Sequence, residues 1–443
     1  MPELALFWTP PRTPSTDFTP EDPLAFDYLG QQVGNWLWPG FTSRTSRAGY
    51  YPFVVYGLRL CDDIAAREGL GRDDGTIRAL FERWERLWAL AVCVYQEGQV
   101  PNGDVMRGLR GALRYYRGQR RGEYSLDFPL LSRQLELGGL GAYLTSLREH
   151  GLVARDRLRP TPLGAQLADW MWGAPGERID HIEDFVRKAL SPDQATIPEK
   201  VGRVTIRTIG EHGGLGKIQH RQTLRDLIWA RLFEDHPPPR HLAHLRVLAE
   251  LLSEANKDGV TDAATFLRGV SSERWRAVDP ALRSLVDLAI AFGDLSAILR
   301  SGFDRAYQAV QNHGCTAPLA AAAEAAFPPE FMDRLVLGRD RWLEQDGVLP
   351  RMSRLESHGP AFVQAMRTMN VSSGAGALVD LLAYHRKVQG DRGRHGGWLR
   401  HDGDLVLLER GGYASWSLDP DRWVVTYKID AMRQLLQDLG RLS

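Results

Sequence analysis

Apolar residues recur at helical spacing along most of this chain of 443 residues. Val54, Leu58, Cys61 and Ala65 repeat every three or four residues behind Pro52, a residue type that suits the first turn of a helix. The same periodicity predicts further helices over 22–37, 76–98, 102–121, 221–233 and 240–255. The fold is therefore expected to be mainly α.

Residues 126–175 depart from this purely helical pattern. A helix that ends at Gly151 is followed by two short strands near 153–159 and by a helix start at Thr161-Pro162. In this order of elements the segment resembles the winged-helix superfamily. The resemblance implies a three-helix fold with a two-stranded wing, and in that superfamily the helix ahead of the wing often enters the major groove of DNA.

The last hundred residues mix helix and strand. The sequence predicts a helix around 361–388, strands over 396–409, 413–419 and 422–429, and a final helix from Asp430. Trp398, Trp416 and Trp423 are expected to anchor this part of the chain, because buried tryptophan supplies a large apolar surface.

These patterns and the length of the chain predict a multidomain helical protein with an internal winged helix-turn-helix and a C-terminal α+β module. The expected divisions are an N-terminal helical domain (1–125), a winged-helix domain (126–175), a helical domain (176–345) and the α+β module (346–443).

Composition limits the classes of partner. Lys and Arg together number 55, as do Asp and Glu, so binding to nucleic acid must come from a local basic patch. Cys61, Cys93 and Cys315 are widely spaced in apolar surroundings, which favours buried thiols in a reducing compartment over a disulfide or zinc framework. With no secretory leader pattern and no apolar run of membrane length, a cytoplasmic protein without membrane contact is expected. No cofactor motif is recognised.

The loop 41–47 is the first candidate site. Arg44 and Arg47 lie among hydroxyl residues just ahead of a helix start, where guanidinium groups and free amides suit a phosphate or another anion. The alternative is a structural clasp, in which the loop ties itself to the next helix while the following aromatic residues fill core.

The same region resembles the N-terminus of uncharacterised bacterial proteins that are associated with phage defence. The shared feature is a turn followed by Thr-x-Arg-x-x-Tyr-Tyr, which here runs from Thr45 to Tyr51. Those proteins usually carry Arg immediately before the aromatic pair, where this chain has Gly49. The resemblance implies a setting and no chemical mechanism.

A second candidate is a run of arginines that step by three or four residues. This spacing places them on one face of a helix, with few carboxylates in the same run. Such a face suits a nucleic-acid backbone, and the alternative is a solvated or acid-paired surface. The arginines are Arg107, Arg110, Arg114, Arg117 and Arg121.

The expected wing supplies the third candidate. Arg155, Arg157 and Arg159 could contact backbone phosphates. The expected recognition helix, 138–149, offers few side chains that read bases, so docking of another protein is the alternative use of this fold.

Enzyme signatures are incomplete. His385 and Asp391 resemble a His-x-Lys-x4-Asp signature of phospholipase-D-type hydrolases, but the Asp comes one residue early and no second copy exists. The sequence therefore favours a non-catalytic, nucleic-acid-contacting or scaffolding subunit of a bacterial multi-protein defence system. The alternatives are a metal-dependent nuclease or other hydrolase that uses segment 385–404, and a transcriptional regulator.

Overall fold

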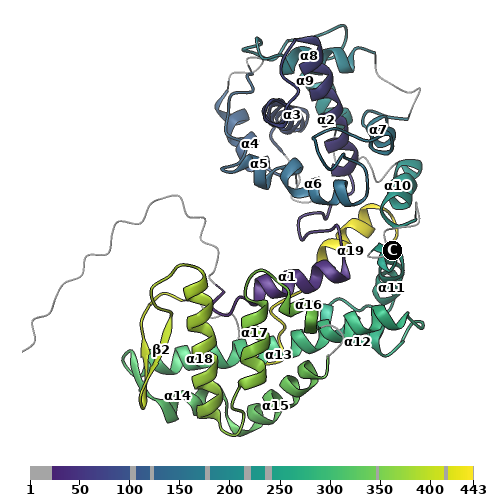
Figure 1. The fold of residues 1–443 in the computed structure, drawn as a ribbon. Coiled ribbons are helices and arrows are strands. Elements are labelled where there is room, and N and C mark those ends of the chain that lie inside the picture. Colours follow the sequence, from purple (N-terminus) through teal and green to yellow (C-terminus); the bar gives the residue numbers. More distant parts are fainter. Residues whose placement is uncertain are drawn as a thin grey trace, which may run out of the picture. The chain divides into compact units, whose positions relative to one another are not determined.

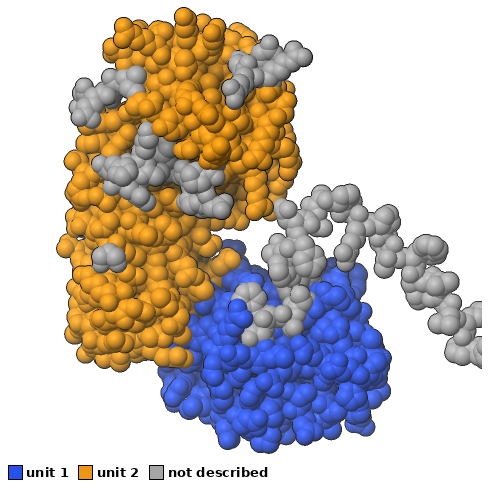
Figure 2. Space-filling model, turned by 180° about the vertical axis from the view of Figure 1, so that it is seen from behind, with its two compact units in different colours: residues 1–30, 290–425 blue, residues 31–289, 426–443 orange. Residues whose placement is uncertain are grey.

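The structure is a computed structural model, and its elements fall into two compact units (Figures 1 and 2). Unit 1, blue in Figure 2, contains residues 1–30 and 290–425, and unit 2, orange, contains residues 31–289 and 426–443. In the described part of the chain, no helix is both long and apolar enough to cross a membrane. The described residues are 22–99, 106–119, 124–174, 180–213, 221–234, 242–345, 349–413 and 418–442.

Unit 2 is built almost entirely from helices, as the apolar periodicity predicts. Two helices, α1 (Phe26–Leu37) and α13 (Pro280–Asn312), contribute residues to both units. The other elements of unit 2 are α2 (Tyr50–Arg67), α3 (Asp74–Tyr95), α4 (Leu109–Gly118), α5 (Gln134–Leu137), α6 (Gly139–Glu149), α7 (Pro162–Ala168), α8 (Ile182–Leu190), α9 (Ile206–Gly213), α10 (Gln222–Trp229), a π-helical turn (Ala230–Glu234), α11 (Leu245–Lys257), α12 (Ala263–Ser271) and α19 (Ile429–Asp438).

Aromatic side chains form the core between α2 and α3. The ring of Phe53 lies 4.0 Å from that of Trp88 and 5.1 Å from that of Trp84, between centroids. Gly57 lets the indole of Trp84 approach the backbone of α2 closely, since a Cβ atom at this position would lie 2.4 Å from Cδ1 of Trp84. Offset and edge contacts of this kind add to the free energy gained from apolar burial.

The connection between α6 and α7 is a tight hairpin (residues 152–161). Val153 and Pro160 form one antiparallel bridge, and the Thr161 amide donates to the Leu152 carbonyl at 3.0 Å. The predicted order of helix, hairpin and helix is therefore present. The ribbon, however, amounts to a single bridge, and the winged-helix assignment stays a prediction.

Unit 1 packs helices around a second aromatic cluster. The ring of Phe26 lies 5.7 Å from Phe362, and Phe292 lies 5.8 Å from Trp342, so α1, α13, α15 and α17 share one core. The elements of this unit beyond α1 and α13 are β1 (Thr316–Pro318), α14 (Leu319–Ala326), α15 (Pro329–Leu343), α16 (Leu349–Ser353), α17 (Gly359–Thr368), α18 (Gly374–Asp391), β2 (Leu399–Asp402) and β3 (Leu405–Leu408).

The strands of unit 1 form a small antiparallel sheet in the order β1-β3-β2. Val406 in the central strand faces Ala317 of β1 and His401 of β2. Gly403, with φ of +58°, lies in the two-residue turn that joins β2 to β3, where a left-handed residue fits the twist of a hairpin. The sequence predicted strand over 396–409, which the structure divides into the β2–β3 hairpin, and the pairing of β1 with it was not predicted.

Two expectations for the C-terminal part need correction, and a third lies mostly outside the described residues. The helix expected over 361–388 is divided into α17 and α18. The strand expected over 422–429 is absent from these described residues, because Trp423 packs against helix α13 and Lys428 has φ of +66°, which turns the chain into α19. Most of the strand expected around Trp416 lies outside the described residues.

Buried and exposed side chains agree with the sequence in part. Trp398 is buried, as are the thiols of Cys61 and Cys93. Cys315 is exposed and lies in the turn that leads into β1, where its φ is +73°. The expectation of buried cysteines is therefore wrong for this residue.

The two units do not follow the expected domain divisions. Residues 22–30 belong with 290–425, and α19 belongs with residues 31–289, so each unit is discontinuous in sequence. Local sequence patterns do not show which distant segments pack together. The expected ranges were 1–125, 126–175, 176–345 and 346–443.

Candidate functional site

Helix α4 is fixed to unit 2 by its inner face. Ala112 is fully buried, and Tyr115 stacks on Phe128 with 4.3 Å between ring centroids. Gly111 allows the helix backbone to approach Leu130, whose carbonyl oxygen would lie 2.3 Å from a Cβ atom at this position. The helix is therefore a packed element with one defined outward face.

The outward side carries three exposed arginines, Arg110, Arg114 and Arg117, here named the arginine face of α4. Arg117 donates to the carbonyl of Gly98 at 3.4 Å. Within the described residues, none of the three side chains pairs with a carboxylate. Guanidinium groups remain charged at physiological pH, so this face presents unneutralised positive charge to solvent.

The other two members of the predicted run do not extend this face. Arg107 precedes α4 and is separated from it by Gly108, whose φ of +79° starts the helix. Its guanidinium donates to the carbonyls of Arg44 at 2.7 Å and Leu137 at 3.3 Å, so it ties loops together. Arg121 lies outside the described residues.

The loop 41–47 has the features of a structural clasp. Buried Arg47 donates from Nε to Oδ2 of Asp438 at 2.8 Å, and the amide of Ala48 donates to the same oxygen at 3.0 Å. Exposed Arg44 donates to the Glu136 carbonyl at 3.2 Å. An external anion would have to displace Asp438 from Arg47, so the geometry favours the clasp over the predicted anion site.

The hairpin arginines divide into two groups. Arg155 and Arg157 are exposed at the tip, and Arg155 lies 3.9 Å from Glu149, at the limit of an ion pair. Arg159 instead turns back and lies 3.2 Å from a carboxylate oxygen of Asp62 in α2. Arg155 and Arg157 are therefore available for contact with nucleic-acid phosphates, whereas Arg159 is paired with Asp62.

Helix α6, the expected recognition helix, uses its polar groups inside unit 2. Tyr143 is fully buried, and its hydroxyl donates to the carbonyl of Arg47 at 3.0 Å. Ser146 is also buried and shares a hydrogen bond of 2.8 Å with the hydroxyl of Tyr51. These side chains cannot reach a base edge without unfolding the core, so α6 has few groups for sequence readout.

The N-terminus of α6 is capped by a buried carboxylate from α3. Glu85 accepts the amide of Gly139 and, at 3.0 Å, the side-chain amide of Gln134. Burial raises the pKa of Glu85 to about 7, and these two hydrogen bonds oppose the rise. The carboxyl satisfies amides that the start of a helix leaves without partners.

We expect Glu85→Gln to remove a pH-dependent component of stability. Because the folded pKa of Glu85 lies above the unfolded value of 4.5, the folded state binds more protons between these values. Stability from this group is present below the unfolded pKa and lost as pH rises through about 7. Between about pH 5 and about pH 8, the free energy of unfolding of the wild type should therefore fall by roughly 2.5 kcal/mol more than that of the variant, as chemical denaturation at the two pH values would show. Equal losses would contradict this account of Glu85.

His385, the first residue of the hydrolase-like signature, has a positioning role in unit 1. Its ring is fully buried, with Nδ1 2.8 Å from the Pro23 carbonyl and Nε2 accepting the amide of Trp398 at 2.9 Å. Burial lowers the pKa of His385 to about 4, so the ring stays neutral at physiological pH. Both ring nitrogens are used, and neither is free to act on a substrate.

The remainder of segment 385–404 does not converge with His385 on a cleft. Asp391 pairs with Lys387 one turn earlier in α18 and lies 3.8 Å from Nδ1 of His358. Across the described ranges, no group of three or more His, Cys, Asp or Glu side chains is placed to hold a metal ion. The geometry therefore gives no support to the alternative of a metal-dependent hydrolase.

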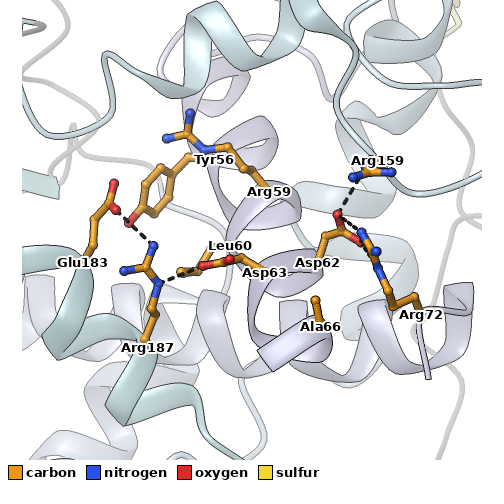
Figure 3. Close-up of a pocket in the computed structure, with 10 residues that line it drawn as sticks. All are labelled: Tyr56, Arg59, Leu60, Asp62, Asp63, Ala66, Arg72, Arg159, Glu183 and Arg187. Carbon is orange, nitrogen blue, oxygen red and sulfur yellow. Dashed lines mark hydrogen bonds and ion pairs between the residues drawn. The ribbon is translucent and has the colours of Figure 1, made fainter. Parts of the chain in front are cut away.

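A charged cleft of about 430 Å³ lies along α2 and was not anticipated from sequence (Figure 3). The helix supplies residues three or four positions apart, which share one exposed face. Arginines from the loop after α2, from the hairpin and from α8 complete its walls. The lining residues are Tyr56, Arg59, Leu60, Asp62, Asp63, Ala66, Arg72, Arg159, Glu183 and Arg187.

The sequence contained one signal of this cleft. Arg59, Asp62 and Asp63 are charged residues on a helix that is mostly apolar, so they mark its exposed face. Their partners lie far along the chain, at Arg159 and Arg187, and spacing could not connect them. The cleft is thus a product of tertiary packing.

Comparison of the chain with protein-family models, with curated proteins and with solved structures gave no match. Both resemblances noted from the sequence therefore stay predictions. The structure thus offers two separate candidate sites, the arginine face of α4 and the charged cleft along α2.

Proposed function

We propose that the protein is a non-catalytic subunit that contacts a nucleic-acid backbone through the arginine face of α4. The observation that carries this proposal is the exposure of Arg110, Arg114 and Arg117 without a described carboxylate partner. A paired surface would already have its charge neutralised. At an unpaired basic surface, binding of a polyanion is favourable because condensed counterions are released.

The spacing of the charges agrees with this use. From Arg110 to Arg117 the helix rises about 10 Å, at about 1.5 Å for each residue. A nucleic-acid strand carries one phosphate for about each 3.4 Å of helix axis, so three guanidinium groups can meet about three phosphates. Such contacts position a protein on the backbone and carry no sequence information.

Arg155 and Arg157 at the hairpin tip supply a second exposed pair in the same unit. They are additional candidates for phosphate contact. The wider setting, a bacterial multi-protein defence system in which a partner performs the chemistry, rests on the resemblance of the N-terminal region alone. A transcriptional regulator is less well supported, since buried Tyr143 and Ser146 cannot read bases.

The variant Arg110→Glu/Arg114→Glu tests the proposal. Its affinity for a fluorescently labelled duplex, measured by anisotropy at moderate salt, should fall at least about tenfold, because attraction becomes repulsion at two positions. The matched control is Arg203→Glu/Arg367→Glu. It changes net charge equally at two exposed arginines that have no ion-pair partner within the described residues. The control should bind like wild type, and equal weakening of both variants would contradict a local binding face.

A further inference from the structure

The charged cleft along α2 has a cationic end. Arg72 donates to both oxygens of Asp62, to Oδ1 from Nε and Nη2 at 2.8 and 2.6 Å and to Oδ2 from Nη2 at 2.5 Å. Arg159 approaches Oδ2 at 3.2 Å. Figure 3 shows both guanidinium groups beside this one carboxylate. Two positive charges therefore share a single negative charge.

Hydrogen-bond donors remain free at this end. A guanidinium group has five N–H donors, and the contacts with Asp62 use only some of those on Arg72 and Arg159. Their side chains are 45% and 47% exposed, so the unused donors can reach a ligand in the cleft. Forked donors of this kind match the oxygens of a phosphate group.

The other end of the cleft carries carboxylates. Arg187 lies between Asp63, at 2.9 Å, and Glu183, at 3.2 Å, as Figure 3 shows. Arg67 also pairs with Asp63, at 3.2 Å, so two arginines lie beside these two carboxylates. The carboxylate oxygens can still accept hydrogen bonds from hydroxyl or amino groups. Leu60 provides apolar lining between the ends.

We propose that this cleft binds a small phosphomonoester. Its phosphate lies beside Asp62 and accepts the N–H donors of Arg72 and Arg159 that Asp62 leaves unused. Its hydroxyl or amino groups face Asp63 and Glu183. The volume of about 430 Å³ falls within the range of small-molecule sites and is too limited for a duplex. None of these residues belongs to the arginine face of α4, so the inference is independent of the proposed function.

Calorimetric titration of the full chain tests this site with inorganic phosphate, ribose 5-phosphate and adenosine monophosphate. Saturable binding of at least one organic phosphate is expected, tighter than that of inorganic phosphate. Arg72→Gln/Arg159→Gln should weaken it at least about tenfold. The control Arg203→Gln, an exposed arginine in the same unit, should leave it unchanged.

The variant Asp62→Asn separates a binding site from a structural ion-pair cluster. Loss of the competing carboxylate should tighten phosphate binding by roughly fourfold, because one nearby negative charge is removed. A cluster that only holds the hairpin would show a lower melting temperature and no gain in affinity, and that result would overturn the proposal. Thermal melts of every variant establish that it is folded.

A short oligonucleotide with and without a 5′-phosphate distinguishes the source of the phosphate. A small-molecule site should accept the free phosphomonoesters whether or not the oligonucleotide binds. Binding of the 5′-phosphorylated oligonucleotide alone would overturn the assignment to a small ligand. Absence of saturable binding by every probe up to about 10 mM would overturn the site itself.

Discussion

Arg300→Met is expected to lower the free energy of unfolding of unit 1 by about 3–5 kcal/mol. Nη1 of Arg300 lies 2.9 Å from Asp22 and Nε lies 3.3 Å from Asp304, and the side chains are only 8%, 5% and 0% exposed. Tyr413 also donates to Asp304, at 2.5 Å. Methionine fills similar space but leaves two buried carboxylates without their counter-charge, which is the costly way to break a buried ion pair.

Hydrogen exchange read by mass spectrometry measures this effect locally in the full chain. Faster exchange should appear in α13 and at the C-terminal end of α18, where Arg300 and Arg392 hold Asp22. Arg367→Met is the matched control, since this exposed arginine of the same unit has no described partner, and its effect should stay within about half a kcal/mol. An Arg300 variant as stable as the control would show that the buried network does not hold unit 1 together.

Trp88→Ala should destabilise unit 2 by a similar amount, about 3–5 kcal/mol. The indole is 2% exposed, lies 4.0 Å from the ring of Phe53 between centroids and donates from Nε1 to the carbonyl of Gly213 at 2.5 Å. Alanine removes the apolar contacts, opens a cavity and leaves that carbonyl without its donor. Chemical denaturation followed by circular dichroism should show the loss.

Trp88→Phe separates the two causes. It restores much of the ring volume without the N–H donor, so its cost should be clearly smaller than that of alanine. Equal costs for the two variants would show that the hydrogen bond to Gly213, and not packing, dominates at this position.

The helices could largely be predicted from the sequence because their causes are local. The helix expected over 76–98 corresponds to α3, Asp74–Tyr95, and its start follows from Asp73, whose side chain accepts the amides of Gly75 and Thr76. Helix caps and apolar periodicity involve residues that are close together in the sequence, so a short segment is enough to recognise them.

The strands were less predictable because they depend on distant partners. Residues 422–429 have strand-like composition, but Trp423 donates to Asp294 and packs against α13, which replaces a strand pairing with a helix contact. Conversely, Thr316–Pro318 becomes β1 only because β3 lies beside it. β-propensity describes a fit to neighbours, and the neighbours are not visible in the sequence.

The candidate sites follow the same division. The exposure of Arg110, Arg114 and Arg117 on one face was predictable, since it needs only helical spacing. The pairing of Arg47 with Asp438 was not, because it joins residues 391 positions apart in the sequence. The cleft around Asp62 was likewise unpredictable, because its walls come from α2, the hairpin and α8, which are far apart in the sequence.

The dependence of binding on salt tests the arginine face of α4 most directly. Affinity for two duplexes of unrelated sequence should fall steeply and equally as salt rises, because phosphate contacts release counterions and carry no base information. Arg110→Glu/Arg114→Glu should reduce the slope of log affinity against log salt by about two units, roughly one for each lost contact. An unchanged slope and affinity in this variant would contradict the proposal that α4 contacts the nucleic-acid backbone.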